Sequence, residues 1–339
     1  MKILSLFDGI SCGRVALDRA GIKVNRYVAY EIDKYAIQVS EFNYPDIEHC
    51  GNVVGADFFK YKGFDLVMGG FPCTDLSLAK ANRRGLKGEH SSLFWEIVRA
   101  IKEVQPKYFL VENNYGMPPE DYRVICDELG CEPIMINSAL VSAQTRKRYY
   151  WTNIAEQSYG LFGDKRCGVP QPQDKGLLLK DILLSGNVHN DKSYCLTSTY
   201  NGACFSHDYE RAQRQLVAEQ INGVQSSLPI CVGNLYSNGS QGGRIYSELA
   251  KSVSLTSNAG GAGAKSGLYA ITNDARTDKI YGVRNGKINI NGKILKINLP
   301  NGMYSIRKLH PIECERLQTL PDSYTANGIN HKGGYYENQ

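Results

Sequence analysis

The chain has 339 residues, of which 42% are hydrophobic and 22% are charged, and its net charge is +5. These values are typical of a folded globular protein and argue against a disordered, collagen-like or coiled-coil chain. No apolar run reaches the roughly 20 residues of a membrane-spanning helix, and the first residues do not predict a secretory signal. We therefore expect no membrane association and a cytoplasmic location in a bacterial or phage-infected cell, or a nuclear one in a eukaryotic cell.

The cysteines and histidines do not form the closely spaced sets that metal sites use. The ten cysteines are scattered along the chain without a CxxC pair, and the six histidines form no HxxxH pattern. Zinc sites need ligands at such spacings. We therefore expect reduced cysteines and no metal site.

Short apolar runs alternate with amphipathic stretches through residues 1–150. This rhythm predicts βαβ units around a mostly parallel sheet, and so an α/β fold. The expected elements are strand 2–8, helix 12–21, strand 27–33, helix 35–42, strand 64–70, helix 92–104, strand 107–113 and helix 123–130. Ligands of such folds bind beyond the carboxyl ends of the strands, so the residues that follow each apolar run are the candidates for a site.

The composition shifts after about residue 155 towards Gly, Asn, Ser and Tyr, and the helical rhythm is mostly lost. Asn-Gly pairs at 285–286, 291–292 and 301–302 are flanked by alternating segments, which predicts consecutive β-hairpins in a β-meander. From residue 304 an amphipathic pattern returns and predicts a helix that docks on the first domain.

The positive charge is not spread evenly along the chain. Its whole excess lies in residues 151–305. A basic segment on an otherwise neutral chain suits a surface that contacts phosphates, but a solvated lysine-rich face explains the same charge.

Phe7, Asp8 and Gly9 follow the first expected strand, and the segment up to Gly13 opens a helix. Glycines there let backbone amides approach a nucleotide-like ligand. Glu31 ends the second expected strand, where an acidic side chain commonly accepts hydrogen bonds from ribose hydroxyls. Together these features favour a nucleoside cofactor, although ordinary turns and helix caps give the same pattern.

Pro72 and Cys73 follow a buried-looking strand and the Gly69-Gly70 turn. A free cysteine is usually an inert small hydrophobic residue, but this position should face the cleft at the carboxyl end of a strand. The polar loop 74–92 would then close over a substrate, or it is a plain surface connection. Cys73 is therefore the first candidate for a catalytic cysteine.

Glu112 ends the apolar run 108–111 and so lies at the same edge of the sheet. Burial there would raise the pKa of its carboxyl group and make it a usable acid, although a strand-end carboxylate can also cap a helix. Arg146 and Arg148 alternate, so in an extended segment both point to one face and can bind phosphate or orient a carboxylate. A generic basic turn explains the same two residues.

The ordered set of these motifs resembles the C5-cytosine DNA methyltransferases, which use S-adenosylmethionine. The matching segments are FDGISCG, Glu31, GGFPCTDLS, VENN, QTRKR and RKLHPIECERLQTLPDSY. The PCTDLS form is similar to the subgroup of phage and bacterial enzymes and animal de novo enzymes. The resemblance implies a Rossmann-like S-adenosylmethionine-dependent methyltransferase domain of residues 1–155 and 304–339, with a smaller, β-hairpin-rich target-recognition domain at 156–303 that binds DNA.

The resemblance also implies roles for individual residues. Cys73 would be the nucleophile that adds to C6 of a cytosine flipped out of double-stranded DNA, and Glu112 would contact N3 of that base. Arg146 and Arg148 would hold the base and Glu112. C5 would then take the methyl group, leaving S-adenosylhomocysteine as the product. The implied cofactor site consists of Phe7, Asp8, Gly9, Gly13, Glu31, Ile32, Asn52, Val53, Pro72 and Leu93.

The sequence departs from the family pattern in three places. Asn114 stands where the usual ENV has a valine, which is a minor change. Asn52 stands where the family usually has aspartate, which bears on adenine recognition. The family's final Gly-Asn-containing motif is not found before the last residues, HKGGYYENQ. This predicts a truncated chain, a second polypeptide that supplies the segment, or impaired cofactor binding.

Three alternatives share part of these features. A cytosine-5 methyltransferase of transfer RNA would carry the same catalytic residues, but a recognition segment of about 150 residues with many hairpins favours duplex DNA. A catalytically impaired DNA-binding or regulatory homologue would explain the missing final motif. An NAD-dependent oxidoreductase would share the fold but explains neither PCTDLS nor ENN.

Overall fold

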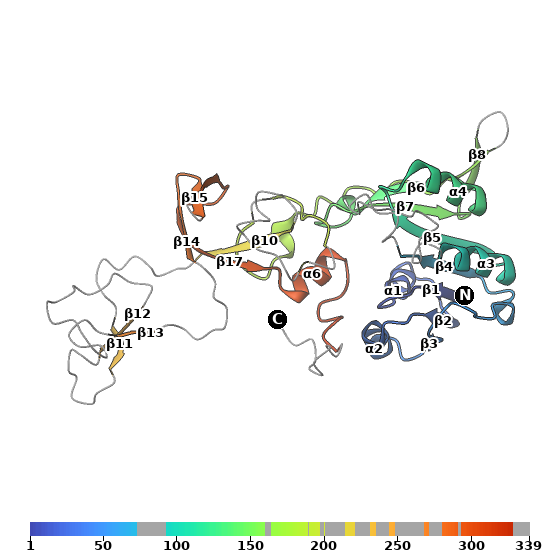
Figure 1. Cartoon of the computed structure of the whole chain (residues 1–339), viewed down its shortest axis with the longest axis horizontal. Coiled ribbons are helices and arrows are strands. Elements are labelled where there is room, and N and C mark those ends of the chain that lie inside the picture. The colour runs from blue at the N-terminus through green and yellow to red at the C-terminus, as the bar shows by residue number, and fades with distance from the viewer. Residues whose placement is uncertain are drawn as a thin grey trace. The chain divides into compact units, whose positions relative to one another are not determined.

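The computed structural model describes most of the first half of the chain and shorter stretches of the second. The described residues are 1–72, 93–159, 164–188, 190–196, 200, 214–220, 231–234, 244–247, 268–270, 280–290 and 293–327. Contacts between Cα atoms divide the chain into two compact units (Figure 1). The first unit comprises Met1–Ile182, Asp191–Thr197 and His310–Gln339, and the second comprises Leu183–Asn190 and Ser198–Leu309.

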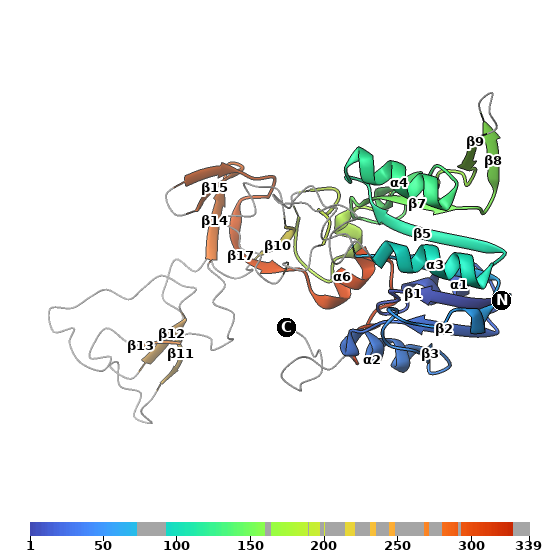
Figure 2. The ribbon, with the colours of Figure 1, turned by 45° about the vertical axis from the view of Figure 1, so that its right-hand side comes forward.

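The first unit contains a seven-stranded sheet. Its strands are β1 (Lys2–Leu6), β2 (Arg26–Tyr30), β3 (Glu48–His49), β4 (Leu66–Gly70), β5 (Tyr108–Asn114), β6 (Ile134–Asn137) and β7 (Lys147–Thr152). They lie in the order β3-β2-β1-β4-β5-β7-β6, parallel from β3 to β5, with β7 antiparallel to both of its neighbours (Figure 2). This arrangement is typical of S-adenosylmethionine-dependent methyltransferases, and it confirms the predicted α/β fold.

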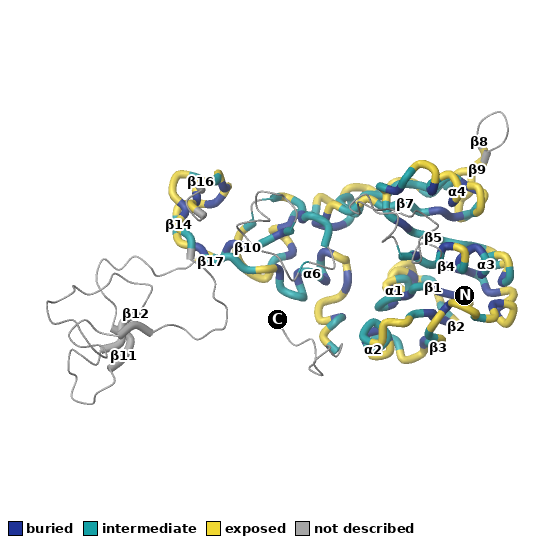
Figure 3. Tube along the Cα trace, viewed as in Figure 1, coloured by how far each residue is buried: buried dark blue, intermediate teal, exposed yellow. Residues whose placement is uncertain are grey.

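Helices cover both faces of this sheet. Helices α1 (Cys12–Arg19), α2 (Lys34–Asn43), α3 (Phe94–Val104) and α4 (Pro119–Leu129) follow β1, β2, β4 and β5, close to the predicted ranges. Successive strand residues point to opposite faces, so Leu4 packs in one cluster with Ile97 of α3, and Ile3 packs in another with Leu17 of α1. Burial on both faces explains the nearly continuous apolar runs of the central strands (Figure 3).

The second unit contains a five-stranded sheet. Its strands are β10 (Leu216–Gln220), β14 (Ile280–Arg284), β15 (Lys287–Ile290), β16 (Lys293–Lys296) and β17 (Gly302–Lys308), in the order β10-β17-β14-β15-β16. Asn285 and Gly286 join β14 to β15 with φ of 52° and 66°, as a type I′ turn requires. β15 also pairs antiparallel with β16, although the intervening 291–292 lie outside the described residues. The first two predicted hairpins are therefore confirmed.

The third predicted hairpin is wrong. Gly302 of the last Asn-Gly pair begins β17, which pairs with β10 and β14 rather than with β16. This position puts Tyr304 into the small hydrophobic core of the sheet, where its side chain is fully buried. The predicted meander therefore ends at β16.

The helix predicted from residue 304 is also wrong for its first residues, because β17 continues to Lys308. Helix α6 (Pro311–Leu317) begins only after the strand. Pro311 suits the first helical position, and His310 forms a capping box with Glu313.

Shorter elements complete the described parts of both units. They are η1 (Phe59–Tyr61), η4 (Ser138–Leu140), η5 (Leu179–Ile182), β8 (Glu156–Tyr159) and β9 (Asp164–Cys167) in the first unit, and β11 (Cys231–Asn234), β12 (Arg244–Ser247) and β13 (Leu268–Ala270) in the second. In the part of the chain that the structure describes, no helix is long and apolar enough to cross a membrane. The described residues contain no group of three His, Cys, Asp or Glu side chains that could hold a metal ion. The predicted domains, 1–155 with 304–339 and 156–303, are functional assignments and remain predictions.

Candidate active site

The strand ends that the sequence singles out lie next to one another at one edge of the sheet. The parallel register pairs Leu6 with Tyr30 on one side and with Gly69 on the other, and it pairs Gly70 with Glu112. The residues that follow β1, β2, β4 and β5 therefore share the carboxyl edge of the sheet.

The loop between β1 and α1 has an unusual backbone. Phe7, Gly9 and Ser11 have φ of 56°, 58° and 62°, in the left-handed region that residues other than glycine seldom adopt. The amide of Gly9 donates a hydrogen bond of 2.8 Å to Oε2 of Glu31. Oε1 of Glu31 accepts two more from the two amides that follow it in the chain. Glu31 thereby ties the end of β2 to the loop.

Asp8 has a buried side chain whose two oxygens both have partners within the protein. Its Oδ1 accepts hydrogen bonds from the hydroxyls of Ser5 at 2.5 Å and Tyr27 at 2.6 Å, and its Oδ2 accepts one from Ser11 at 2.5 Å. The carboxylate therefore supports the loop from inside the protein, so a cofactor contact by Asp8 would use its backbone.

Gly13 has a packing role that is independent of any ligand. A Cβ atom at this position would lie 2.4 Å from Cε of Met68 and 3.2 Å from the hydroxyl of Tyr27. Helix α1 approaches β4 this closely because residue 13 has no side chain.

Three other residues implied in the cofactor site lie near the ends of β2 and β3, in different environments. Oδ1 of Asn52 accepts a hydrogen bond of 2.9 Å from the amide of Val54. Val53 is buried in the core, whereas Ile32 is 74% exposed.

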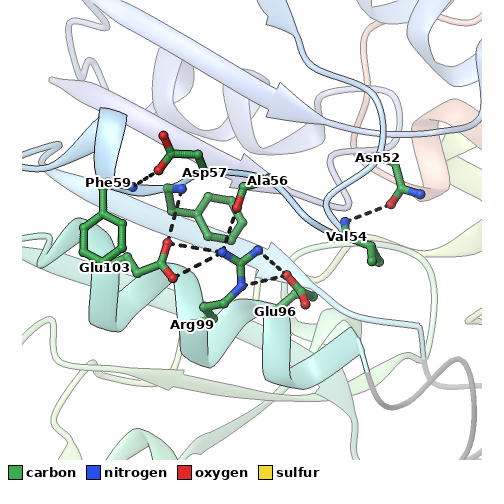
Figure 4. A network of polar contacts seen from close by, with 9 residues as sticks. Asn52, Val54, Ala56, Asp57, Phe59, Glu96, Arg99 and Glu103 are labelled. Carbon is green, nitrogen blue, oxygen red and sulfur yellow. Dashed lines mark hydrogen bonds and ion pairs between the residues drawn. The ribbon is translucent and has the colours of Figure 1, made fainter.

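Arg99 of α3 holds the segment 56–58, a role that was not predicted from the sequence. Its guanidinium lies 4.3 Å from the ring centroid of Phe58 and donates a hydrogen bond of 2.7 Å to a carbonyl of the same segment (Figure 4). It also pairs with Glu96 and Glu103. These two carboxylates, three residues before and four after Arg99, are the sequence signal that would have found it.

Pro72 and Leu93 border residues 73–92, which include Cys73 and lie outside the described residues. Pro72 is partly buried, and Leu93 packs against the core at the start of α3. The roles of Cys73 as nucleophile and of the loop 74–92 as a lid therefore remain predictions.

Glu112, near the end of β5, is held by an arginine from the neighbouring strand. Its Oε1 lies 2.8 Å from Nε of Arg148 on β7. Burial raises the pKa of Glu112 above its ordinary value, and the positive charges of Arg148 and Arg146 oppose that rise. The carboxyl group is thus oriented by an ion pair while its environment favours the protonated form.

Gly70 leaves the room that this carboxyl group occupies. A Cβ atom on Gly70 would lie 2.7 Å from Oε2 of Glu112, which is closer than such contacts occur. A glycine at the end of β4 is therefore a condition for the observed position of Glu112.

Asn113 anchors the turn that leads towards Cys73. Its buried side chain donates a hydrogen bond of 3.0 Å from Nδ2 to the carbonyl of Phe71. Its Oδ1 accepts one of 2.7 Å from the amide of Asn114. The residue after Glu112 therefore joins the end of β5 to the turn that follows β4, a role that no local sequence pattern indicates.

Arg146 is in contact with a segment far from it in sequence. Its Nη1 lies 3.2 Å from Sγ of Cys195. The ammonium group of Lys192 holds that segment by donating to the carbonyls of Ala139, Ser142 and Leu177. Both Arg146 and Arg148 thus have defined partners, and both act on the carboxyl group of Glu112.

Comparison with known proteins identifies the family. The model of the C-5 cytosine-specific DNA methylases matches residues 1–336. The chain is 23% identical over 337 residues to the type II methyltransferase M.HhaI of Haemophilus parahaemolyticus, covering 96% of this chain and 86% of that protein. It is 25% identical over 405 residues to the orphan methyltransferase M.SPRI of Bacillus phage SPR, covering 95% and 89%.

A third relative matches over a shorter stretch. The chain is 31% identical over 201 residues to the type II methyltransferase M1.ScrFI of Lactococcus lactis subsp. cremoris, covering 56% of this chain and 50% of that protein. The family match, by contrast, spans nearly the whole chain. The chain therefore belongs to the C-5 cytosine-specific DNA methylases and is a DNA (cytosine-5) methyltransferase.

Proposed function

We propose that the chain methylates C5 of cytosine in double-stranded DNA with S-adenosylmethionine, using Cys73 as nucleophile and Glu112 as acid. The observation that carries the proposal is the position of Glu112, paired in register with Gly70, three residues before Cys73. Arg148 holds one oxygen of Glu112 at 2.8 Å, and the other oxygen lies over Gly70. The acid is thereby oriented at the strand end that precedes the cysteine.

The chemistry explains why both groups are needed. C5 of cytosine is too weak a nucleophile to take a methyl group directly, but addition of the Cys73 thiolate to C6 moves electrons towards C5 as Glu112 gives its proton to N3. The raised pKa of Glu112 keeps that proton available at a pH where an exposed glutamate has lost it. S-adenosylmethionine, when bound, supplies an electrophilic methyl group to C5. A base then removes the C5 proton, the thiolate leaves C6 by elimination, and the N3 proton returns to Glu112.

The residues at the ends of β1 and β2 fit this cofactor. A carboxylate has about four acceptor positions, and the three amide hydrogen bonds to Glu31 leave capacity for a ribose hydroxyl. The exposed side chain of Ile32 next to it can pack against the adenine ring. The proposed set is Phe7, Asp8, Gly9, Gly13, Glu31, Ile32, Asn52, Val53, Pro72 and Leu93.

We assign recognition of double-stranded DNA to residues 156–303. The excess of positive charge within residues 151–305 suits contacts with phosphates. Because the reaction uses both faces of the base, the cytosine has to leave the helical stack. Competition between duplex DNA and transfer RNA tests this assignment, and preferential methylation of transfer RNA would contradict it.

The proposal is tested by transfer of a labelled methyl group from S-adenosylmethionine to mixed-sequence duplex DNA. We expect Cys73→Ser to abolish transfer and Glu112→Gln to lower the rate by about 10²- to 10⁴-fold, with DNA binding retained in both. Cys167→Ser, in the hairpin of β8 and β9, is the matched control and should keep the wild-type rate. Unchanged turnover in Cys73→Ser would refute the nucleophile. Inactive wild type that binds DNA would favour an impaired homologue.

A further inference from the structure

A row of four polar side chains, three buried and one half-buried, adjoins the loop that opens α1. It runs from His49 of β3 through Ser40 of α2 and Ser11 to Asp8. The distances are 3.1 Å from Nε2 of His49 to Oγ of Ser40, 2.5 Å between the two serine oxygens, and 2.5 Å from Oγ of Ser11 to Oδ2 of Asp8. Both serines are fully buried, so each hydroxyl has to find its partner within the protein. We call this row the His49 relay.

Asp8 is the acceptor end of the relay. Besides Ser11, its carboxylate accepts hydrogen bonds from Ser5 and Tyr27, which stand on the α1 face of β1 and β2. An ionised carboxylate has no hydrogen to donate, so each of the three hydroxyls has to donate to it. Ser11 therefore donates its single hydroxyl hydrogen to Asp8.

The hydrogen count then fixes the direction of the remaining bonds. Because Ser11 has no hydrogen left, Ser40 has to donate to Ser11. Ser40 in turn has none left for His49, so the proton between them belongs to Nε2 of His49. The other ring nitrogen, Nδ1, is buried and has no hydrogen-bond partner within the described ranges, so His49 acts through Nε2.

Ser11 has a conformation that this partner set explains. It precedes α1, where a serine side chain usually caps the helix, but its Oγ makes no capping hydrogen bond. Its φ of 62° is strained for a residue with a Cβ atom. The bonds to Asp8 and Ser40 offset the missing capping bond and the backbone strain, and they hold Ser11 in this conformation.

We propose that the His49 relay positions the loop 7–11 for S-adenosylmethionine, with Nε2 of His49 donating towards Asp8 through the two serines. The relay fixes Asp8 and Ser11 on either side of Gly9, whose amide binds Glu31. His49, Ser40 and Ser11 are thus positioning residues that touch no substrate. The inference rests on the proposed function for the ligand of the loop, whereas the bond directions do not depend on it.

The first test measures the tautomer of His49 in the ligand-free wild-type chain. Heteronuclear NMR correlation of the ring nitrogens distinguishes the tautomers, and the signals of His49 are those that disappear in His49→Gln. We expect a hydrogen on Nε2. A ring protonated on Nδ1 alone overturns the relay.

The second test measures binding of S-adenosylmethionine by calorimetry, together with steady-state kinetics. Ser40→Ala breaks the relay and His49→Leu removes its donor, so the Kd and KM for S-adenosylmethionine should rise roughly fivefold, as for one lost hydrogen bond. The kcat at saturating cofactor and the affinity for DNA should stay unchanged. His49→Gln keeps an N–H donor and should restore the wild-type Kd.

Ser142→Ala is the matched control, because Ser142 is equally buried but donates its hydroxyl to the carbonyl of Leu317, outside the relay. We expect it to keep the wild-type Kd. Equal affinity of folded Ser40→Ala and wild type, or a loss in His49→Leu that His49→Gln does not reverse, overturns the positioning role. If the wild type binds no S-adenosylmethionine, the proposed function is refuted. The NMR test of the ligand-free chain does not depend on cofactor binding, so it shows separately whether the relay is present.

Discussion

The two compact units differ in how their side chains are held. In the first unit, partners far apart in sequence fix the strand ends, as in the pair of Glu112 and Arg148 and in the bond from Asn113 to Phe71. In the described part of the second unit, the order comes from strand pairing: β14, β15 and β16 form hairpins, and β17 pairs with β14 and the distant β10 over a small core around Val283. We infer that the first unit holds a preorganised reaction centre and the second a scaffold for DNA-contacting loops. Changes in the first should alter the chemical step, and changes in the second the affinity for DNA.

The largest expected difference between the two units comes from adding a methyl group at a strand glycine. Gly70→Ala should lower kcat by about 100-fold, because its Cβ displaces the Oε2 end of Glu112 and a shift of about 1 Å costs that much. The clash involves only the end of a flexible side chain, so the free energy of unfolding should change little. Single-turnover methyl transfer and urea unfolding measure the two effects.

Gly282→Ala, in β14 of the second unit, is the matched control. Among the described residues, its Cβ would meet Sδ of Met303 alone, at an ordinary 3.5 Å. We expect wild-type kcat and stability. If Gly70→Ala kept wild-type kcat, the position of Glu112 over Gly70 would be irrelevant to the reaction.

Removing a buried amide side chain gives the next largest effect. Asn113→Ala should lower the free energy of unfolding by about 1–3 kcal/mol, because the carbonyl of Phe71 loses its buried donor. It should also lower kcat, since the turn before Cys73 loses its anchor. Asn153→Ala, which removes two similar bonds to backbone groups at the opposite end of β5, should cost stability without changing kcat. Equal loss of kcat in both variants would show that stability alone explains the effect.

A cavity in the core of the second unit tests whether this unit determines the affinity for DNA. Val283 is 1% exposed, so Val283→Ala should lower the stability of this unit by about 1–2 kcal/mol and weaken DNA binding. The Kd for S-adenosylmethionine should not change. Ile294→Ala, at a side chain that is 67% exposed, is the control and should leave both affinities unchanged. A parallel loss of cofactor affinity in Val283→Ala would contradict the division of roles.

The features that could be predicted from the sequence are those that depend on local patterns. Apart from the two-residue strand β3, the strands and helices up to residue 130 follow from local patterns of apolar residues, and the edge that carries Glu31 and Glu112 follows from parallel topology. Asn285-Gly286 predicted its turn because two residues with positive φ suffice to specify it.

The features that escaped prediction depend on distant pairing. The place of β17 between β10 and β14 is a non-local choice that no window of the sequence contains. The role of Gly70 depends on its register with Glu112, and that of Asn113 on where the turn after β4 lies. Local residue types predicted which side chains lie at this edge, whereas register decides which of them touch.

The smallest expected effect is a shift of the pH profile, and it identifies the acid. Burial raises the pKa of Glu112, while Arg148 and Arg146 lower it. If protonated Glu112 gives its proton to N3, kcat falls as the pH rises through this pKa. Arg148→Gln removes a positive charge, so the pKa of Glu112 rises further and the alkaline limb of the pH profile of kcat moves to higher pH. The rate itself falls, because the carboxyl group loses its ion-pair partner.

Lys147→Gln makes the same charge change one residue earlier, on an exposed side chain that points to the opposite face of β7. It should leave the alkaline limb in place. If Lys147→Gln and Arg148→Gln shifted the limb equally, the change in net charge alone would explain the shift. Arg146→Gln should move the limb in the same direction as Arg148→Gln but by less, because Arg148 has the larger influence and also the direct bond. A limb that moves to lower pH in Arg148→Gln would mean that the titrating group is not Glu112, and the acid would then have to be sought among the remaining residues of this edge.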